Sequence, residues 1–116
     1  MSQGEILCRL ADLPDEGSLR LDFAADEYGH GLCVIRKDSR TYAYLNRCAH
    51  QGTAMDWVAG EFLDASGEHI ICAMHGAHFR IEDGYCVLGP CRGQFLRAVR
   101  VAEDGEYLRL DEPDLS

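Results

Sequence analysis

Two short segments of the sequence pair a cysteine with a histidine, and these are the residues best suited to chemistry. The first segment reads CAHQG at 48–52 and the second reads CAMHG at 72–76. Each brings a thiolate donor and an imidazole donor close together, and each ends in a glycine that lets the backbone turn sharply beside a bulky group. The four candidate ligands are Cys48, His50, Cys72 and His75.

Two thiolates and two imidazoles suit two kinds of metal centre. A single zinc ion takes four such ligands at the corners of a tetrahedron. A two-iron cluster takes the same four, with both thiolates on one iron and both imidazoles on the other. Because each segment supplies one ligand of each kind, two parallel loops would bring the sulfurs to one side and the imidazoles to the other. This arrangement favours the two-iron centre and leaves zinc as the alternative.

The elements that must position these segments are short strands separated by turn residues. Apolar or alternating runs predict strands at 18–23, 31–37, 41–46, 69–72, 78–81, 85–88, 94–102 and 107–110. Turn residues fill 38–40, 82–84 and 103–105. The pattern predicts an all-β fold, an antiparallel sandwich or barrel. The segment 49–67 is rich in alanine, glycine and acidic residues, and we expect an extended loop there with room for one helical turn.

Composition narrows the range of partners. The chain of 116 residues has 20 acidic and 11 basic side chains and a formal charge of −9. This balance argues against nucleic acid and against anionic membranes, both of which need a basic surface. The first ten residues have no secretory pattern, and no apolar run is long enough to span a bilayer. We therefore expect a cytoplasmic protein with no membrane contact.

The two Cys/His segments resemble the ligand boxes of the Rieske iron–sulfur family. The resemblance runs from about residue 45 to about residue 92. It includes GAHF at 76–79, the turn at 82–84 and GP at 89–90, where that family has its cluster-binding hairpin and its proline loop. It implies one 2Fe-2S cluster, held through sulfur and imidazole nitrogen by Cys48, Cys72, His50 and His75. It also implies a single Rieske domain over 1–116 with a smaller cluster-binding subdomain at about 45–92.

The resemblance is to the soluble ferredoxin branch of that family, such as the ferredoxin components of ring-hydroxylating dioxygenases. Thr53 and Met74 stand where the membrane-bound respiratory relatives carry a pair of disulfide-forming cysteines. A monomeric electron carrier without catalysis of its own is implied, passing single electrons from a flavin-containing reductase to a terminal oxidoreductase such as a dioxygenase. Two other roles stay open: a small subunit of a larger redox enzyme, similar to that of assimilatory nitrite reductase, and a zinc-bound structural module.

The remaining cysteines are expected to be thiols. Cys86 and Cys91 bracket the proline loop. A strained disulfide between them is the alternative, but a reducing compartment favours two thiols, one packed and one partly exposed. Cys8 and Cys33 lie in apolar strand patterns, which predicts small core residues.

Two positions after the second box bear on the reduction potential. High-potential relatives have a serine and a tyrosine hydroxyl where this chain has Ala77 and Phe79, so the resemblance implies that two donors to the cluster sulfurs are missing. We therefore expect a potential near the bottom of the Rieske range, on the order of −150 mV. His78 lies between these positions, and alternation predicts that it faces the opposite way, at the surface or on an edge strand.

Overall fold

The computed structural model of the chain describes residues 6–21, 31–47, 55, 56, 58, 60–73 and 76–111. Regular structure in these ranges is almost entirely antiparallel strand, which confirms the all-β prediction. One 3-10 helix, η1 (Leu10–Asp12), is also present. The strands are β1 (Ile6–Arg9), β2 (Gly17–Leu21), β3 (Leu32–Lys37), β4 (Arg40–Leu45), β5 (His69–Ile71), β6 (His78–Arg80), β7 (Cys86–Leu88), β8 (Val101–Glu103) and β9 (Tyr107–Leu110).

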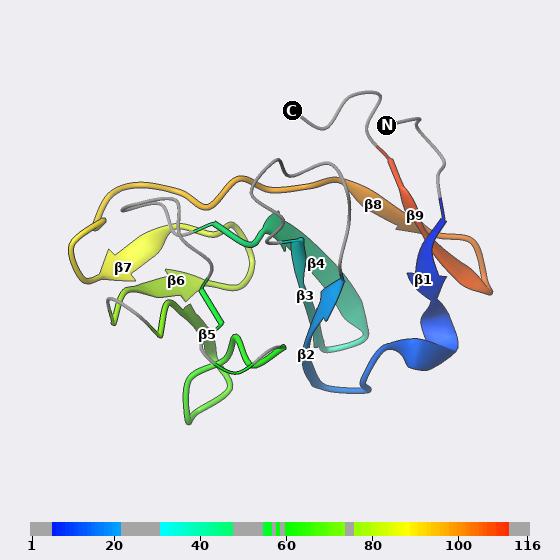
Figure 1. The fold of residues 1–116 in the computed structure, drawn as a ribbon, viewed down its shortest axis with the longest axis horizontal. Coiled ribbons are helices and arrows are strands. Elements are labelled where there is room, and N and C mark those ends of the chain that lie inside the picture. Colours follow the sequence, from blue (N-terminus) through cyan, green and yellow to red (C-terminus); the bar gives the residue numbers. More distant parts are fainter. Residues whose placement is uncertain are drawn as a thin grey trace.

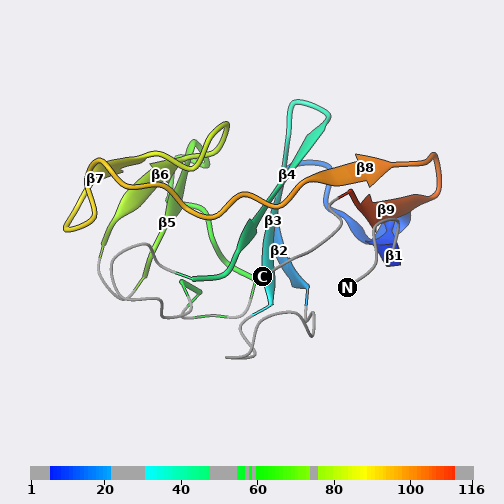
Figure 2. The ribbon, with the colours of Figure 1, turned by 90° about the horizontal axis from the view of Figure 1, so that it is seen from above.

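The strands form three small sheets that stand in a row (Figure 1). One outer sheet has the order β1-β9-β8, the central sheet has the order β2-β3-β4, and the other outer sheet has the order β5-β6-β7. The view from above shows the same row, with the central sheet between the two others (Figure 2). No helix in the described part of the chain is long and apolar enough to cross a membrane.

The hairpin of β3 and β4 turns through two residues. Lys37 pairs with Arg40, so the turn consists of Asp38 and Ser39 alone, at φ 52° and 64°. Two consecutive positive φ angles are typical of the type I′ turn, whose twist matches that of the flanking strands. The sequence predicted a three-residue turn at 38–40, but Arg40 is the first residue of β4.

Both faces of β3 are buried, and each face belongs to a different hydrophobic core. Leu32 and Val34 face one core, whereas Cys33 and Ile35 face the other. We call the first the aliphatic core, made of Leu32, Val34, Ala43, Leu45, Val99, Leu108 and Leu110. We call the second the mixed core, made of Cys33, Ile35, Tyr44, Met55, Phe62, Ile70, Cys72, Ala77, Phe79, Ile81, Cys86, Cys91 and Leu96. The central sheet is therefore the wall between two cores.

The connecting segment 92–100 runs along the molecule from β7 to β8 (Figures 1 and 2). The sequence predicted a strand over 94–102, which is wrong for most of that range, because regular pairing begins only at Val101. The segment instead makes isolated bridges, Tyr85 with Phe95 and Tyr44 with Ala98. Its partners change along its length because it passes from one outer sheet, along β4, to the other.

The segment 49–67 was expected to be an extended loop. Its described residues, 55, 56, 58 and 60–67, include no helical turn. Leu63 forms an isolated bridge with Ile70, and Phe62 is fully buried in the mixed core. The end of the segment is therefore anchored to β5, directly before the second Cys/His box.

Candidate metal centre

The residues on either side of the first box are held together by one buried amide side chain. Asn46 is fully buried, and its Oδ1 accepts a hydrogen bond of 2.8 Å from the Met55 backbone N–H. Its Nδ2 donates to Asp56 Oδ1 at 2.7 Å. Cys48 and His50 lie between these positions, outside the described residues. The side chain of Asn46 thus closes the loop that carries the first two candidate ligands.

The carboxylate of Asp56 makes two further contacts that hold this region in place. Its Oδ2 accepts a hydrogen bond of 3.0 Å from the Gly60 N–H and lies 3.7 Å from Arg20 Nη1. Buried carboxylates need such partners to offset the loss of water. Asp56 therefore ties the end of the first box to β2 through Arg20.

The second box forms a tight turn between β5 and β6. Cys72 is fully buried, its carbonyl accepts a hydrogen bond of 2.8 Å from the Gly76 N–H, and its N–H donates to Ala77 O at 2.9 Å. Gly76 adopts φ 70°, a conformation that favours glycine. His75 lies outside the described residues. The glycine after this box is therefore needed for the turn itself.

One backbone hydrogen bond joins the second box to the residues that follow the first. The N–H of Ala73, in the second box, donates to the carbonyl of Met55, at the end of the first loop, at 3.0 Å. The side chain of Met55 is fully buried in the mixed core. The described residues beside both boxes are therefore in contact with each other. Of the four candidate ligands, Cys72 is the one that the structure describes.

The proline loop 86–91 packs directly against Ala77, the residue after the second box. A Cβ atom added to Gly89 would lie 2.7 Å from the Cα of Ala77 and 3.1 Å from its Cβ, so only glycine fits there. Ala77 and Phe79 are both fully buried, and neither side chain carries a hydroxyl. Cys86 and Cys91 are both fully buried thiols, so the prediction that one is partly exposed is wrong.

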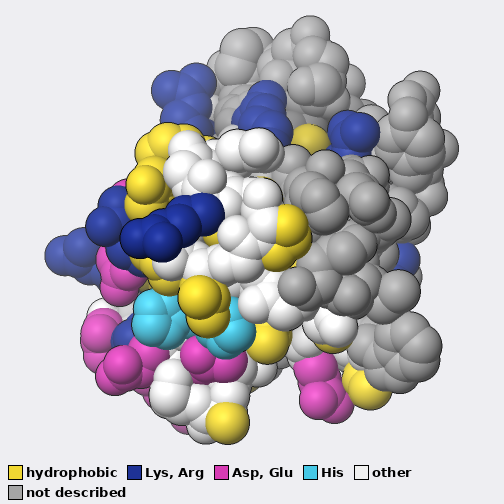
Figure 3. Space-filling model, turned by 90° about the vertical axis from the view of Figure 1, so that its left-hand side faces the viewer, with side chains coloured by type: hydrophobic (Ala, Val, Ile, Leu, Met, Phe, Trp, Pro, Cys, Tyr) yellow, Lys and Arg dark blue, Asp and Glu magenta, His cyan; other side chains and the backbone are white. Residues whose placement is uncertain are grey.

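Three polar residues that sequence reasoning left apart meet on the outer face of β5 and β6. Asp64 Oδ2 lies 3.5 Å from His69 Nδ1 and 3.8 Å from His78 Nε2. The centroids of the two histidine rings are 6.1 Å apart. Figure 3 shows histidine side chains (cyan) next to acidic side chains (magenta) on one face of the molecule. A hydrogen bond from Ser66 holds the pKa of Asp64 below its usual value.

The predicted orientation of His78 is confirmed, but its strand is not an edge. His78 lies on the face opposite Phe79, in the central strand of the sheet β5-β6-β7. Ile71 pairs with His78 and His69 with Arg80, so the two histidines are diagonal neighbours on one face. The group formed by Asp64, His69 and His78 can therefore be recognised only from the pairing register of β5 on β6. Among the described residues, no three His, Cys, Asp or Glu side chains are placed to hold a metal ion.

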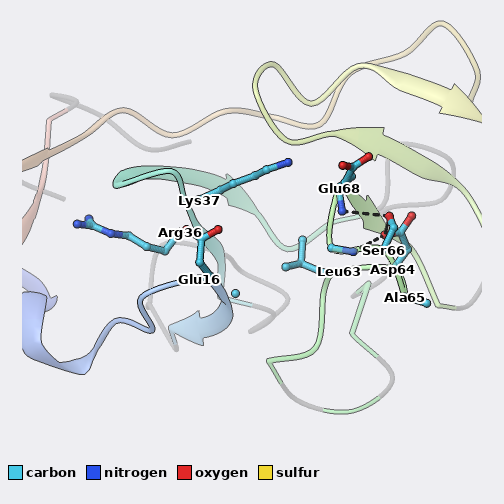
Figure 4. A pocket seen from close by; sticks show the side chains of 10 residues that line it. Glu16, Arg36, Lys37, Leu63, Asp64, Ala65, Ser66 and Glu68 are labelled. Carbon is cyan, nitrogen blue, oxygen red and sulfur yellow. Dashed lines mark hydrogen bonds between the residues drawn. The ribbon is translucent and has the colours of Figure 1, made fainter.

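A polar cavity of about 480 Å³ lies between the β3–β4 hairpin and the segment 63–68. Figure 4 shows Lys37 reaching from the hairpin across it towards Glu68, while the guanidinium of Arg36 points away. Arg36 instead donates to Thr41 Oγ1 at 2.6 Å and pairs with Glu103 at 2.9 Å. Charges of both signs line the cavity, which favours a hydrated groove over a binding site for one kind of ion.

The donor set and its surroundings fit a metal centre at the joined boxes. A buried thiol, a second box closed by a glycine turn, and hydrogen bonds that hold both boxes at one end are the features that such a centre needs. These features alone suit zinc as well as a two-iron cluster.

Comparison with known proteins separates these alternatives. The profile of the Rieske 2Fe-2S domain matches residues 5–103, most of the chain. No curated protein sequence matches significantly.

Solved structures of ferredoxins share the fold over nearly their whole length. The ferredoxin of Sphingomonas yanoikuyae B1 is 22% identical with a TM-score of 0.73, over 95% of this chain and 99% of that one. The ferredoxin of carbazole 1,9a-dioxygenase from Nocardioides aromaticivorans IC177 is 24% identical with a TM-score of 0.72, over 94% and 97%. A chain from a complex of reduced oxygenase and oxidized ferredoxin in carbazole 1,9a-dioxygenase is 21% identical with a TM-score of 0.72, over 100% of both.

Proposed function

Because the chain belongs to the Rieske 2Fe-2S domain family, we propose that it is a one-electron carrier of the ferredoxin type, with no catalysis of its own. The family implies one 2Fe-2S cluster, which supplies a centre that gains and loses a single electron. We propose Cys48, His50, Cys72 and His75 as its ligands. The observation that carries this proposal is the hydrogen bond between Ala73 and Met55, which holds the flanks of both boxes together.

The residues around the site have separate tasks in this proposal. Asn46 and Asp56 join the residues that flank the first box, so the proposed ligands Cys48 and His50 belong to a segment whose two ends are held together. The proline loop, through Gly89, packs on Ala77 directly after the second box. Ala77 and Phe79 contribute bulk without hydroxyl donors, which supports the low reduction potential expected from the sequence.

The domain organisation follows from the same proposal. We propose one Rieske domain over 1–116, in which about 45–92 forms the cluster-binding subdomain. The sheet β5-β6-β7 and the proline loop lie within that range, whereas the other two sheets form the base.

A flavin-containing reductase is the proposed electron donor, and a terminal oxygenase of a ring-hydroxylating dioxygenase is the proposed acceptor. The likeness in fold to ferredoxins over nearly their whole length supports a separate carrier, monomeric and cytoplasmic, over a subunit of a larger enzyme. The formal charge of −9 suits partners with a basic docking surface, because opposite charges speed encounter.

The test is to purify the protein anaerobically and measure iron, acid-labile sulfide, zinc, the visible spectrum and the electron paramagnetic resonance of the dithionite-reduced form. We expect two irons and two sulfides per chain, a red-brown colour and a midpoint potential on the order of −150 mV. Stoichiometric zinc without sulfide would contradict the cluster. Copurification with a large subunit in equal amounts would contradict the separate carrier, and a potential above about +100 mV would contradict the donor.

A further inference from the structure

Two cysteines that the proposed cluster does not use lie in contact at the ends of the proline loop. The sulfur of Cys91 is 3.0 Å from the sulfur of Cys86, and both residues are fully buried thiols. A disulfide has a sulfur–sulfur distance of about 2.05 Å, so the two atoms need to approach by only about 1 Å. At this distance the Cys91 thiol donates a hydrogen bond to the Cys86 sulfur.

The backbone holds the two cysteines in this position. Cys86 donates to the carbonyl of Gln94 at 2.8 Å and accepts from the N–H of Gly93 at 3.2 Å. Gln94 in turn donates to the carbonyl of Cys91 at 2.9 Å. The chain therefore enters β7 at Cys86, leaves it at Leu88, turns at Gly89 and returns beside the start of that strand. Contact between the sulfurs is thus enforced by the loop closure.

The other described thiols outside the boxes are Cys8 and Cys33. Burial raises the pKa of both, and because thiols react as thiolates, burial by itself makes a cysteine a poor reactant. Cys86 and Cys91 are also buried, and what sets them apart is geometry, since each has a second thiol in contact at 3.0 Å.

We propose that Cys86 and Cys91 form an oxidative modification site, at which a peroxide converts the two thiols into an intrachain disulfide in the folded, cluster-loaded protein. Peroxide transfers one oxygen to a thiol, giving a sulfenic acid and one water or alcohol. The second thiol then attacks that sulfur, forms the S–S bond and releases one water. Two thiols are oxidised by two electrons, and one peroxide bond is reduced.

Access to the buried sulfurs comes through the loop between them. Leu88 is 57% exposed, and Gly89 and Pro90 are exposed as well. Local opening of this loop therefore admits a small peroxide, and closure returns the second thiol to the oxidised sulfur. Because Gly89 abuts Ala77, the disulfide would fasten the loop against the second box. The modification would thus slow loss of the cluster.

The sequence provides a direct assay for this disulfide. Trypsin cleaves after Arg80 and Arg92 and releases the peptide 81–92, which contains Cys86 and Cys91 and no other cysteine. The experiment treats the cluster-loaded protein with hydrogen peroxide, follows the visible spectrum, then alkylates under denaturing conditions and digests. We expect the peptide to be two hydrogen masses lighter and unalkylated in most chains while the spectrum is intact, and doubly alkylated after prior reduction.

A matched pair of variants separates the dithiol from ordinary packing. Cys33→Ala and Cys91→Ala each remove one fully buried thiol from the mixed core. Cys33→Ala should still form the light peptide, whereas Cys91→Ala should lose its spectrum in peroxide at least twice as fast as Cys33→Ala. A doubly alkylated peptide in protein with an intact spectrum would overturn the proposal. So would a disulfide that appears only after the spectrum is lost, or cross-links to peptides outside 81–92.

Discussion

The aliphatic core and the mixed core lie on opposite faces of β3, but they differ in residue composition. Every member of the aliphatic core is a Leu, Val or Ala side chain. The mixed core contains four cysteines and is bordered by the buried Asn46 and Asp56. The aliphatic core is formed mostly by strands, with Val99 from the connecting segment and Leu10 from η1 at its border, whereas loop ends joined by hydrogen bonds form part of the wall of the mixed core. We infer that the sheets β1-β9-β8 and β2-β3-β4 are stable without a cluster. The sheet β5-β6-β7 and the loops beside it depend on the cluster for their stability.

The largest effect is expected from removing Cys72, the proposed ligand that the structure describes. Cys72→Ser should abolish the cluster spectrum and loosen the mixed core, because binding energy of a centre that joins two loops is also folding energy. Cys8→Ser is the control, since Cys8 is half-buried beside the aliphatic core. The visible spectrum and far-ultraviolet circular dichroism of both variants are the measurements. Full iron content in Cys72→Ser would show that the ligand set is wrong.

Two core truncations sharpen the comparison. Leu108 and Ile70 are both fully buried, the first in the aliphatic core and the second in the mixed core. Leu108→Ala and Ile70→Ala should each lower the free energy of unfolding by about 2–5 kcal/mol. Denaturant titration should show that only Ile70→Ala also loses the visible spectrum earlier. Equal shifts of the spectrum in both variants would mean that the cores are not independent.

Two glycines separate backbone strain from a steric clash. Gly89 and Gly105 have φ 107° and 94°, but only the Cβ of an alanine at 89 would meet another part of the chain. Gly105→Ala should cost about 1 kcal/mol or somewhat more from strain alone. Gly89→Ala should add about 1–3 kcal/mol from overpacking against Ala77 and should accelerate cluster loss. Thermal melts and spectra followed over time would reveal the order, and similar values for both variants would refute the close approach.

The smallest expected effect is on the acid stability of the sheet β1-β9-β8. A hydrogen bond from Arg109, together with the backbone N–H groups of Tyr107 and Glu106, lowers the pKa of Asp104 to about 2. Since the folded pKa is below the unfolded value, the contribution of Asp104 is present above about pH 4 and is lost as the pH falls through about 2. Asp104→Asn should remove this pH dependence. Unfolding free energies from pH 5 to pH 2 that fall equally in both proteins would contradict it.

Local signals were sufficient where the structure is local. The runs at 31–37 and 41–46 match β3 and β4 within one residue, because apolar patterning and a turn between them define a hairpin. The run 94–102 failed for a non-local reason. Leu96 belongs to the mixed core and Val99 to the aliphatic core, so the segment crosses between cores and cannot keep one alternating face.

In the candidate site, too, local features could be predicted from the sequence, and features that depend on the tertiary structure could not. The two boxes are recognisable because ligand types and spacing are local features, and the structure joins their flanks through Ala73 and Met55. The cluster of Asp64, His69 and His78 was missed because it requires the register of β5 on β6. The burial of both Cys86 and Cys91 was missed because it depends on how the connecting segment returns past β7.

The two-sided burial of β3 limits where the chain can change in length. Insertion of one residue within β3 would exchange the side chains that face the two cores, so Cys33 and Ile35 would enter one core as Leu32 and Val34 entered the other. The two-residue turn between β3 and β4 cannot absorb an added residue, because Asp38 and Ser39 both adopt positive φ. The turn after β8 carries no such double constraint, and the Cβ position of Gly105 faces open space. Added peptides and tags are therefore best tolerated near Gly105 and least tolerated in the central sheet.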